Sequence, residues 1–146
     1  MARYSVGALA AGAGSTTLPS GSLYAVAGAS FKMRECGISN TTATAVAQAL
    51  KILTTAGTQG AALTEAKQDD NSLTSSCQGF NTHTAGTPIG SDLGYRAQLG
   101  AAVGSAFVWT FGDVGLRVPL TTANGIGTAT ENGTGQVIQF YFVWDE

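Results

Sequence analysis

The chain has 146 residues, enough for one domain with a sizeable core. Only 11% of them are Asp, Glu, Lys or Arg, against roughly 25% in typical soluble domains. The net charge is −2 and the seven cations are scattered, which excludes the clustered basic surface that nucleic-acid binding needs. No apolar run reaches the roughly 18 residues of a membrane-spanning helix. A surface of hydroxyls and amides gives little repulsion between copies, and this favours a component of a fixed assembly over a free enzyme.

The first segment, residues 1–20, is expected to form an extended N-terminal arm, followed by a β-sandwich domain at 21–146. The segment is rich in Gly, Ala and Ser and too poor in bulky residues to fold alone. An extended backbone can still lie along another protein and form hydrogen bonds with it. A disordered tail is the alternative. The side chains expected to anchor the arm on that protein are Arg3, Tyr4, Val6, Leu9 and Leu18.

Short runs of alternating apolar and polar residues, separated by turn-forming residues, predict strands in the next part of the chain. Residues 23–27 and 31–38 are two such runs, and the second places Phe31, Met33 and Glu35 on one face. Together they indicate that the sandwich begins soon after residue 20.

Residues 42–54 fit both a helical stripe and a strand face. Threonines at both ends, with Lys51 as the single charged residue, favour the strand. Residues 61–90 have little periodicity and are expected to form a long excursion that contains one short helix. Excursions of this length in a compact domain are usually functional or form an interface.

An aromatic strand is predicted near residue 109. Phe107, Trp109 and Phe111 alternate with smaller residues, which places three rings on one side of a strand. After a turn, residues 116–119 continue as extended chain until Pro119, which suits the end or edge of a strand.

The clearest predicted strand is 136–144. The alternation places one uniformly apolar face against one mixed face, a pattern that a helix does not produce. The apolar face is formed by Ile138, Phe140, Phe142 and Trp144, and the mixed face by Val137, Gln139, Tyr141 and Val143. Residues 126–130 are the predicted partner strand of a terminal hairpin, because Asn132–Gly133 suits a tight turn.

Seven or eight strands of this kind indicate an all-β fold, a jelly-roll-like β-sandwich. We expect the apolar face of 136–144 to fill the sandwich, since each buried ring contributes several kcal/mol at about 25 cal/mol per Å². Tyr141 and Val143 then point outward, where they are expected to contact a neighbouring subunit.

No residue of this sequence is predicted to be catalytic, to bind a cofactor or to ligate a metal. His83, the single histidine, lies among Asn and Thr and is interpreted as a hydrogen-bonded loop residue rather than part of a triad. Asp69–Asp70 lacks the spacing of a calcium loop and is interpreted as a solvated turn.

Two cysteines, Cys36 and Cys77, are interpreted as reduced, small apolar residues. A disulfide bond across the 41-residue separation is the alternative; it would stabilise the fold by perhaps 3–4 kcal/mol in the chain-entropy model.

Several separated segments resemble a family of small structural proteins of tailed bacteriophages. The similarity extends over roughly residues 30–146, in pieces rather than as one motif. The segments are 34–50, 53–60, 80–84, 106–116, 124–127 and the closing 140–144.

The resemblance implies a capsid decoration (cement) protein on the outer surface of the virion head. Proteins of this kind commonly form homotrimers and stabilise the shell, so the expected partners are the major capsid protein and further copies of the chain. Neither an enzymatic activity nor a cofactor, membrane or nucleic-acid partner is implied. The alternative function is a receptor- or carbohydrate-binding β-sandwich module of a head or tail fibre.

Overall fold

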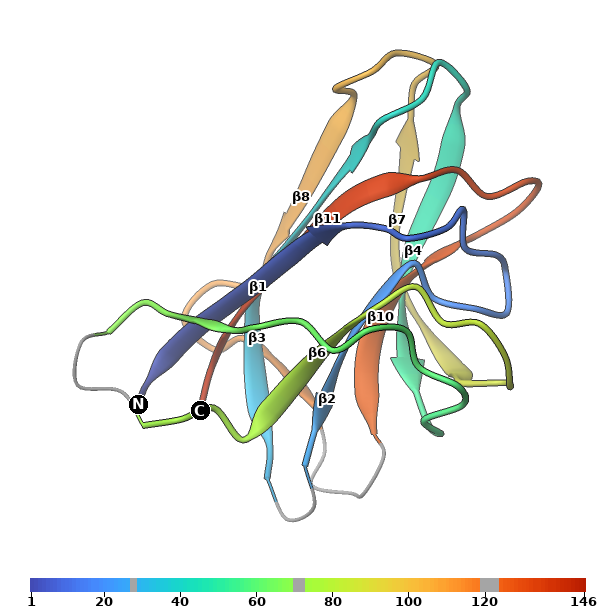
Figure 1. The fold of residues 1–146 in the computed structure, drawn as a ribbon. Helices are drawn as coiled ribbons and strands as arrows, with labels where there is room; N and C mark the ends of the chain where they lie inside the picture. The colour runs from blue at the N-terminus through green and yellow to red at the C-terminus, as the bar shows by residue number, and fades with distance from the viewer. Residues whose placement is uncertain (27–28, 70–72, 119–123) are drawn as a thin grey trace.

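Two antiparallel β-sheets pack face to face in this chain (Figure 1). The computed structural model describes residues 1–26, 29–69, 73–118 and 124–146, and over these ranges it contains strands and no helix. The predicted all-β sandwich is therefore confirmed. No helix in the described ranges could cross a membrane.

Sheet A has the order β5-β1-β11-β3-β8, with β9 also paired to β3, and sheet B has the order β6-β2-β10-β4-β7. The strands of sheet A are β1 (Arg3–Leu9), β3 (Phe31–Asn40), β5 (Ala66–Lys67), β8 (Ala106–Thr110), β9 (Leu116–Val118) and β11 (Ile138–Asp145). Those of sheet B are β2 (Gly21–Ala25), β4 (Val46–Leu53), β6 (Cys77–Asn81), β7 (Ile89–Leu99) and β10 (Gly125–Thr130).

The described residues form eleven strands, more than the seven or eight predicted. β1 lies in the segment expected to be an arm, and β5, β6 and the start of β7 lie in the segment expected to be an excursion. The strand interpretation of 42–54 is confirmed by β4. The short helix expected within 61–90 is wrong for the described part of that range, which contributes β5, β6 and the start of β7. Pro119 lies outside the described residues.

The structure differs from the expected extended arm at residues 1–20. β1 pairs along its whole length with β11, from Arg3 opposite Asp145 to Leu9 opposite Gln139. The accessible surface of the chain, 6543 Å², is near the roughly 6,900 Å² of a compact monomer of this mass. The segment needs few bulky residues of its own, because β11 supplies the apolar surface on which it packs.

The core lies between the sheets and is dominated by β11. Its inward residues Ile138, Phe140, Phe142 and Trp144 are all buried, so the predicted apolar face is confirmed. Cys36 and Cys77 are buried and free, as predicted, and burial raises the pKa of both thiols. Both cysteines therefore act as apolar side chains.

One extra residue in β3 inverts its alternation. The pairing with β11 shifts between Val143 opposite Glu35 and Trp144 opposite Met33, which leaves Arg34 as the additional residue of a bulge. Phe31 and Met33 point into the core as predicted, but Glu35 does not. It lies on the outer face instead.

The predicted terminal hairpin is wrong, although both of its strands exist. β10 pairs with β2 and β4 in sheet B, whereas β11 pairs with β1 and β3 in sheet A. Residues 131–137 carry the chain from one sheet to the other. Gly133 does adopt a left-handed φ of 70°, but turn chemistry does not determine whether the strands on either side pair.

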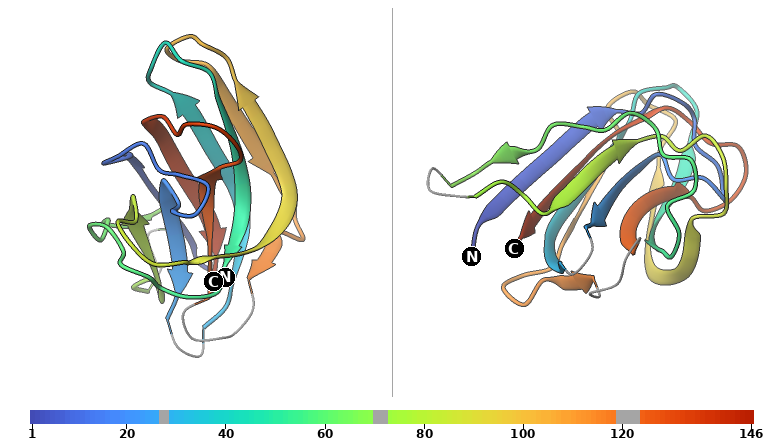
Figure 2. Two further views of the ribbon diagram at one scale, coloured as in Figure 1. Left: turned by 90° about the vertical axis from the view of Figure 1, so that its right-hand side faces the viewer. Right: turned by 60° about the horizontal axis from the view of Figure 1, so that its bottom comes forward.

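The two chain ends lie side by side at one end of the sandwich (Figure 2). Backbone hydrogen bonds of 3.0 Å join Ala2 and Glu146 in both directions. The Glu146 carboxylate also accepts hydrogen bonds from Ser75, Ser76 and the Trp144 indole. These bonds hold the last strand in place together with its packing.

Candidate functional site

The side chains of sheet A that point away from sheet B form a surface called here the outer face of sheet A. Directly paired residues on neighbouring strands point to the same side of a sheet, so the register defines three rows across β1, β11, β3 and β8. The rows are Leu9–Gln139–Ser39–Ala106, Gly7–Tyr141–Gly37–Val108 and Ser5–Val143–Glu35–Thr110. Most side chains in these three rows are small, and Glu35 is the only charged one among them. A further row at the end of the sheet carries the charged residues Arg3, Asp145 and Lys32.

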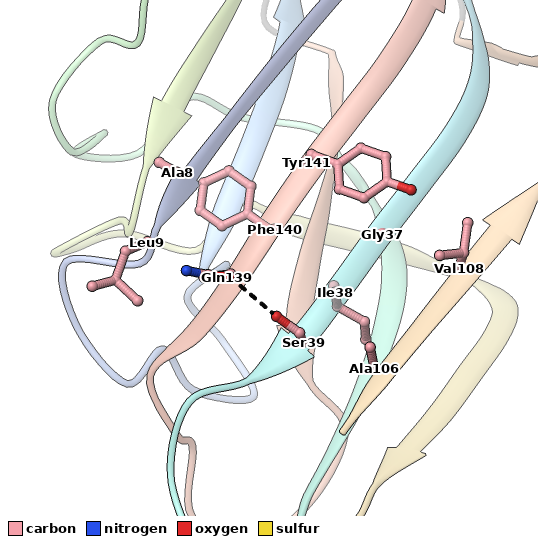
Figure 3. Close-up of a pocket in the computed structure, with 10 residues that line it drawn as sticks. All are labelled: Ala8, Leu9, Gly37, Ile38, Ser39, Ala106, Val108, Gln139, Phe140 and Tyr141. Carbon is pink, nitrogen blue, oxygen red and sulfur yellow. Dashed lines mark hydrogen bonds between the residues drawn. The ribbon is translucent and has the colours of Figure 1, made fainter. Parts of the chain in front are cut away.

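A shallow groove of about 410 Å³ runs across this face (Figure 3). Tyr141 and Gly37 form its floor, on β11 and β3. Its two sides carry Leu9 on β1 and Val108 on β8, which are 53% and 46% exposed. The groove is therefore open to solvent between two apolar side chains.

The Tyr141 ring lies across Gly37, where a Cβ atom would overlap the ring carbons. Its hydroxyl donates a hydrogen bond to the Glu35 carboxylate. Partial burial, followed by this hydrogen bond and the negative charge of Glu35, raises the pKa of Tyr141 to about 12. The ring is thus fixed at its tip and neutral at physiological pH.

Two polar side chains lie beside the ring. The Ser39 hydroxyl donates to the Gln139 carbonyl oxygen at 3.4 Å, and the amide nitrogen of Gln139 points away from Ser39 (Figure 3). The groove therefore combines a fixed aromatic ring with a hydroxyl and an amide.

The structure places the predicted contact residues in three different environments. Leu9 lies on the outer face of sheet A, as do Tyr141 and Val143, which point outward as predicted. Tyr4 and Val6 are 1% and 4% exposed. These two residues belong to the core, so the prediction that their side chains anchor the chain on a capsid is wrong.

Arg3 and Leu18 are partly accessible. Arg3 pairs with Asp145, with 2.7 Å between Nε and Oδ1, and Leu18 lines a shallow pocket beside His83. Gly37 and Val108 were missed in the sequence. The alternation around Trp109 could have indicated an outward Val108, but the role of Gly37 depends on which strand pairs with β3.

The outer face of sheet B is covered by two segments, 54–63 and 82–88. They join each other through a bridge between Thr58 and Ala85. The Tyr24 hydroxyl donates to the Thr55 carbonyl oxygen at 2.9 Å. Under this cover Leu53 is fully buried. Sheet B therefore has a second apolar layer that belongs to the same chain.

His83 belongs to this cover and is 2% exposed. Its Nε2 lies 2.8 Å from the Ser22 hydroxyl, and its ring stacks on Tyr24 with 5.9 Å between centroids. Burial lowers the pKa of His83 to about 4. The prediction of a hydrogen-bonded loop histidine is confirmed, and its partner Ser22 is also fully buried.

Four charged residues form a closed network where β4, β7 and β10 meet. The Lys51 ammonium lies 2.9 Å from Asp92 and 2.7 Å from Glu131, and Arg96 pairs with the same two acids. A hydrogen bond from the Gly94 backbone, followed by those from Lys51 and Arg96, lowers the pKa of Asp92 to about 2. Two cations and two acids cancel, so the network is structural.

Within the described ranges, no three His, Cys, Asp or Glu residues converge as metal ligands. Comparison of the chain with models of known protein families, with curated proteins and with solved structures found no match. The outer face of sheet A, with its open groove, is the candidate site.

Proposed function

We propose that this chain is a capsid decoration (cement) protein of a tailed bacteriophage. In this proposal it is a jelly-roll-like sandwich that lies on the outer surface of the head as a homotrimer, contacts the major capsid protein, catalyses no reaction and needs no cofactor. The supporting observation is the part of the outer face of sheet A formed by the three rows across β1, β11, β3 and β8, an uncovered surface on which the one charged residue, Glu35, already has a partner in Tyr141.

Such a face suits docking on another protein. Small side chains allow close approach of a partner, and little charge has to be removed from water on contact. Four strands about 4.8 Å apart, over some five residues of each, give on the order of 300 Å². A standard interface buries about 800 Å² per partner, so a single copy would bind weakly. A trimer that engages several sites at once would bind far more tightly, which agrees with a role in a repeating shell.

The copy number in purified particles tests this function. Quantitative mass spectrometry against the major capsid protein is expected to find hundreds of copies per particle in a fixed ratio. A handful of copies would instead indicate a fibre, and their absence from the particle would refute a virion role.

Leu9→Asp tests the docking face itself. Burying an unpaired carboxylate is costly, so binding to heads that lack the chain should fall by about tenfold or more, since tenfold corresponds to about 1.4 kcal/mol. Leu73→Asp is the matched control, because Leu73 is exposed on another part of the chain. Equal decoration by Leu9→Asp and wild type would contradict docking through this face.

Carbohydrate binding is the second candidate function, favoured by the flat Tyr141 ring beside Ser39 and Gln139. An aromatic platform with adjacent hydroxyl and amide groups can hold one sugar ring. A glycan array with wild type and Tyr141→Ala tests this function. Carbohydrate binding predicts a defined set of bound saccharides whose signal disappears in the variant. Binding that survives the substitution would exclude the groove as the saccharide site.

A further inference from the structure

Apart from the three-residue β9, which pairs with β3 alone, the described residues form four edge strands, and three of them are protected from pairing with other chains. β5 has two residues. The open side of β6 is already bonded to residues 61–63, because the Leu63 amide donates to the Gly79 carbonyl and the Asn81 amide donates to the Ala61 carbonyl, both at 2.9 Å. β7 has two irregularities in its register, a left-handed Gly94 and charged residues. Each device disfavours the addition of a strand.

β8, the fourth edge strand, has none of these protections. It is the outermost strand of sheet A, at the upper left in Figure 1. Its five residues are Ala-Phe-Val-Trp-Thr, without Gly, Pro or charge, and the uncharged stretch extends over 97–112. Its pairing with β3 is regular from Glu35 opposite Thr110 to Ser39 opposite Ala106.

The register shows which backbone groups of β8 point away from β3. Hydrogen bonds from Asn40 to the Ser105 carbonyl and from Phe111 to the Arg34 carbonyl mark the odd-numbered residues as those bonded to β3. In an antiparallel ladder the intervening residues direct both N–H and C=O to the opposite side. Ala106, Val108 and Thr110 therefore present six groups at the open edge.

Exposed apolar side chains are frequent on β8 and in the segments next to it in the sequence. Of the nine large apolar residues that are exposed among the described residues, five lie within 95–114. They are Tyr95, Val103, Phe107, Val108 and Val114. Such a concentration marks an interaction surface, and here it coincides with unpaired backbone groups.

We propose that β8 pairs antiparallel with β8 of a second copy, about a two-fold axis at Val108, so that sheet A continues from one molecule into the next. In this register Val108 lies opposite Val108 of the other copy, and Ala106 lies opposite Thr110. All six outward groups of each strand are then bonded. This contact goes beyond the docking face and holds whether or not the chain decorates a shell.

A second copy fits this edge better than an unrelated partner for two reasons. The open groups are symmetric about Val108, so the strand is complementary to itself. Both copies are uncharged along the contact, so the two-fold axis brings no like charges together. Each copy has one such edge, so pairing closes at two molecules instead of forming a fibre. If three copies also assemble about another axis, this contact joins one ring to the next.

The mass of the purified chain in solution tests the contact. Light scattering at micromolar concentration is expected to give an even number of copies for wild type and half that number for Val108→Lys, which places two ammonium groups together at the axis. Val26→Lys is the matched control, because Val26 is 51% exposed and distant in sequence from β8. It should keep the wild-type mass.

Hydrogen exchange provides a second readout that does not depend on a variant. In the pair, the amides of Ala106, Val108 and Thr110 are protected at least as well as those of Phe107 and Trp109, which bond to β3. In a monomer these three amides exchange at least about a hundredfold faster than their neighbours. A wild-type monomer, an odd assembly unaffected by Val108→Lys, or rapid exchange at all three positions would overturn the proposal.

Discussion

The outer face of sheet B is covered by other segments of the chain, whereas the outer face of sheet A is exposed over the described residues. On sheet B, segments 54–63 and 82–88 lie over the strands and leave Leu53 without exposed surface. On sheet A, nothing in the described chain covers β1, β11, β3 and β8, and Leu9 is 53% exposed. The chain supplies a second layer for one sheet only.

Two tyrosines show what this difference means. Tyr24 on sheet B bonds to the Thr55 carbonyl of the overlying segment, so its hydroxyl ties two layers together. Tyr141 on sheet A bonds to Glu35 of its own sheet and lies flat over Gly37. Sheet B is stabilised by a layer from within the chain, whereas under the proposed function the layer over sheet A is a docking partner.

The largest expected effect comes from one substitution made on each face. Leu53→Ala removes a fully buried side chain and should lower the free energy of unfolding by about 2–5 kcal/mol. Leu9→Ala removes a side chain that stays in contact with water and should change it by about 0.5 kcal/mol or less. Urea denaturation followed by circular dichroism measures both. Similar losses for the two variants would show that the faces are not different in the isolated chain.

The next effect depends on pH and on sheet B alone. Burial holds the pKa of His83 at about 4, below the 6.5 of an unfolded histidine. The unfolded chain therefore binds the extra proton first, so stability is complete above pH 6.5 and declines as the pH falls toward 4. Between pH 6.5 and 5 the loss should be roughly 2 kcal/mol.

His83→Phe removes this titration while keeping an aromatic ring against Tyr24. It costs the hydrogen bond of Ser22, so the variant should be less stable at pH 7 but nearly independent of pH between 6.5 and 5. Thermal unfolding across that range is the measurement. His83 is the single histidine of the chain. If the variant were as sensitive to pH as wild type, the pH dependence would therefore come from a group that is not a histidine.

Local alternation was enough to predict β2, β3, β8, β10 and β11 and the buried face of β11. The inward set of β11 and the outward direction of Tyr141 and Val143 follow from a period of two, and β4 was predicted from threonines at the ends of its segment. The two main errors, the arm and the terminal hairpin, share one cause. Each error concerns which strands are neighbours in a sheet. Neighbours can be distant in the sequence, as β1 and β11 are, so local patterns do not identify them.

The candidate site was only half predictable for the same reason. Leu9 and Tyr141 come from opposite ends of the chain. Pairing of β1 with β11 brings both side chains to the outer face of sheet A. Gly37 has no recognisable signal until Tyr141 is placed over it. The bulge at Arg34 then moves Glu35 to the outer face, and a strict alternation cannot predict that change.

The smallest expected effect concerns the Tyr141 ring on the bare face. Glu35→Gln removes a negative charge but keeps an acceptor for the hydroxyl, so stability at pH 7 should change by about 1 kcal/mol or less. Burial alone then raises the pKa of Tyr141, which should fall from about 12 toward 10. Absorbance at alkaline pH, with Tyr141→Phe subtracted, follows this phenol.

Glu131→Gln is the control for this titration, because Glu131 pairs with Lys51 and Arg96 rather than with Tyr141. It should leave the Tyr141 midpoint unchanged. In wild type the raised pKa favours the folded state below pH 10, and this contribution is lost as the pH rises through 12. If Glu35→Gln left the midpoint at its wild-type value, Glu35 would not hold the ring. Tyr141 could then swing away from Gly37, and the face would present a mobile side chain in place of a fixed platform for a docking partner.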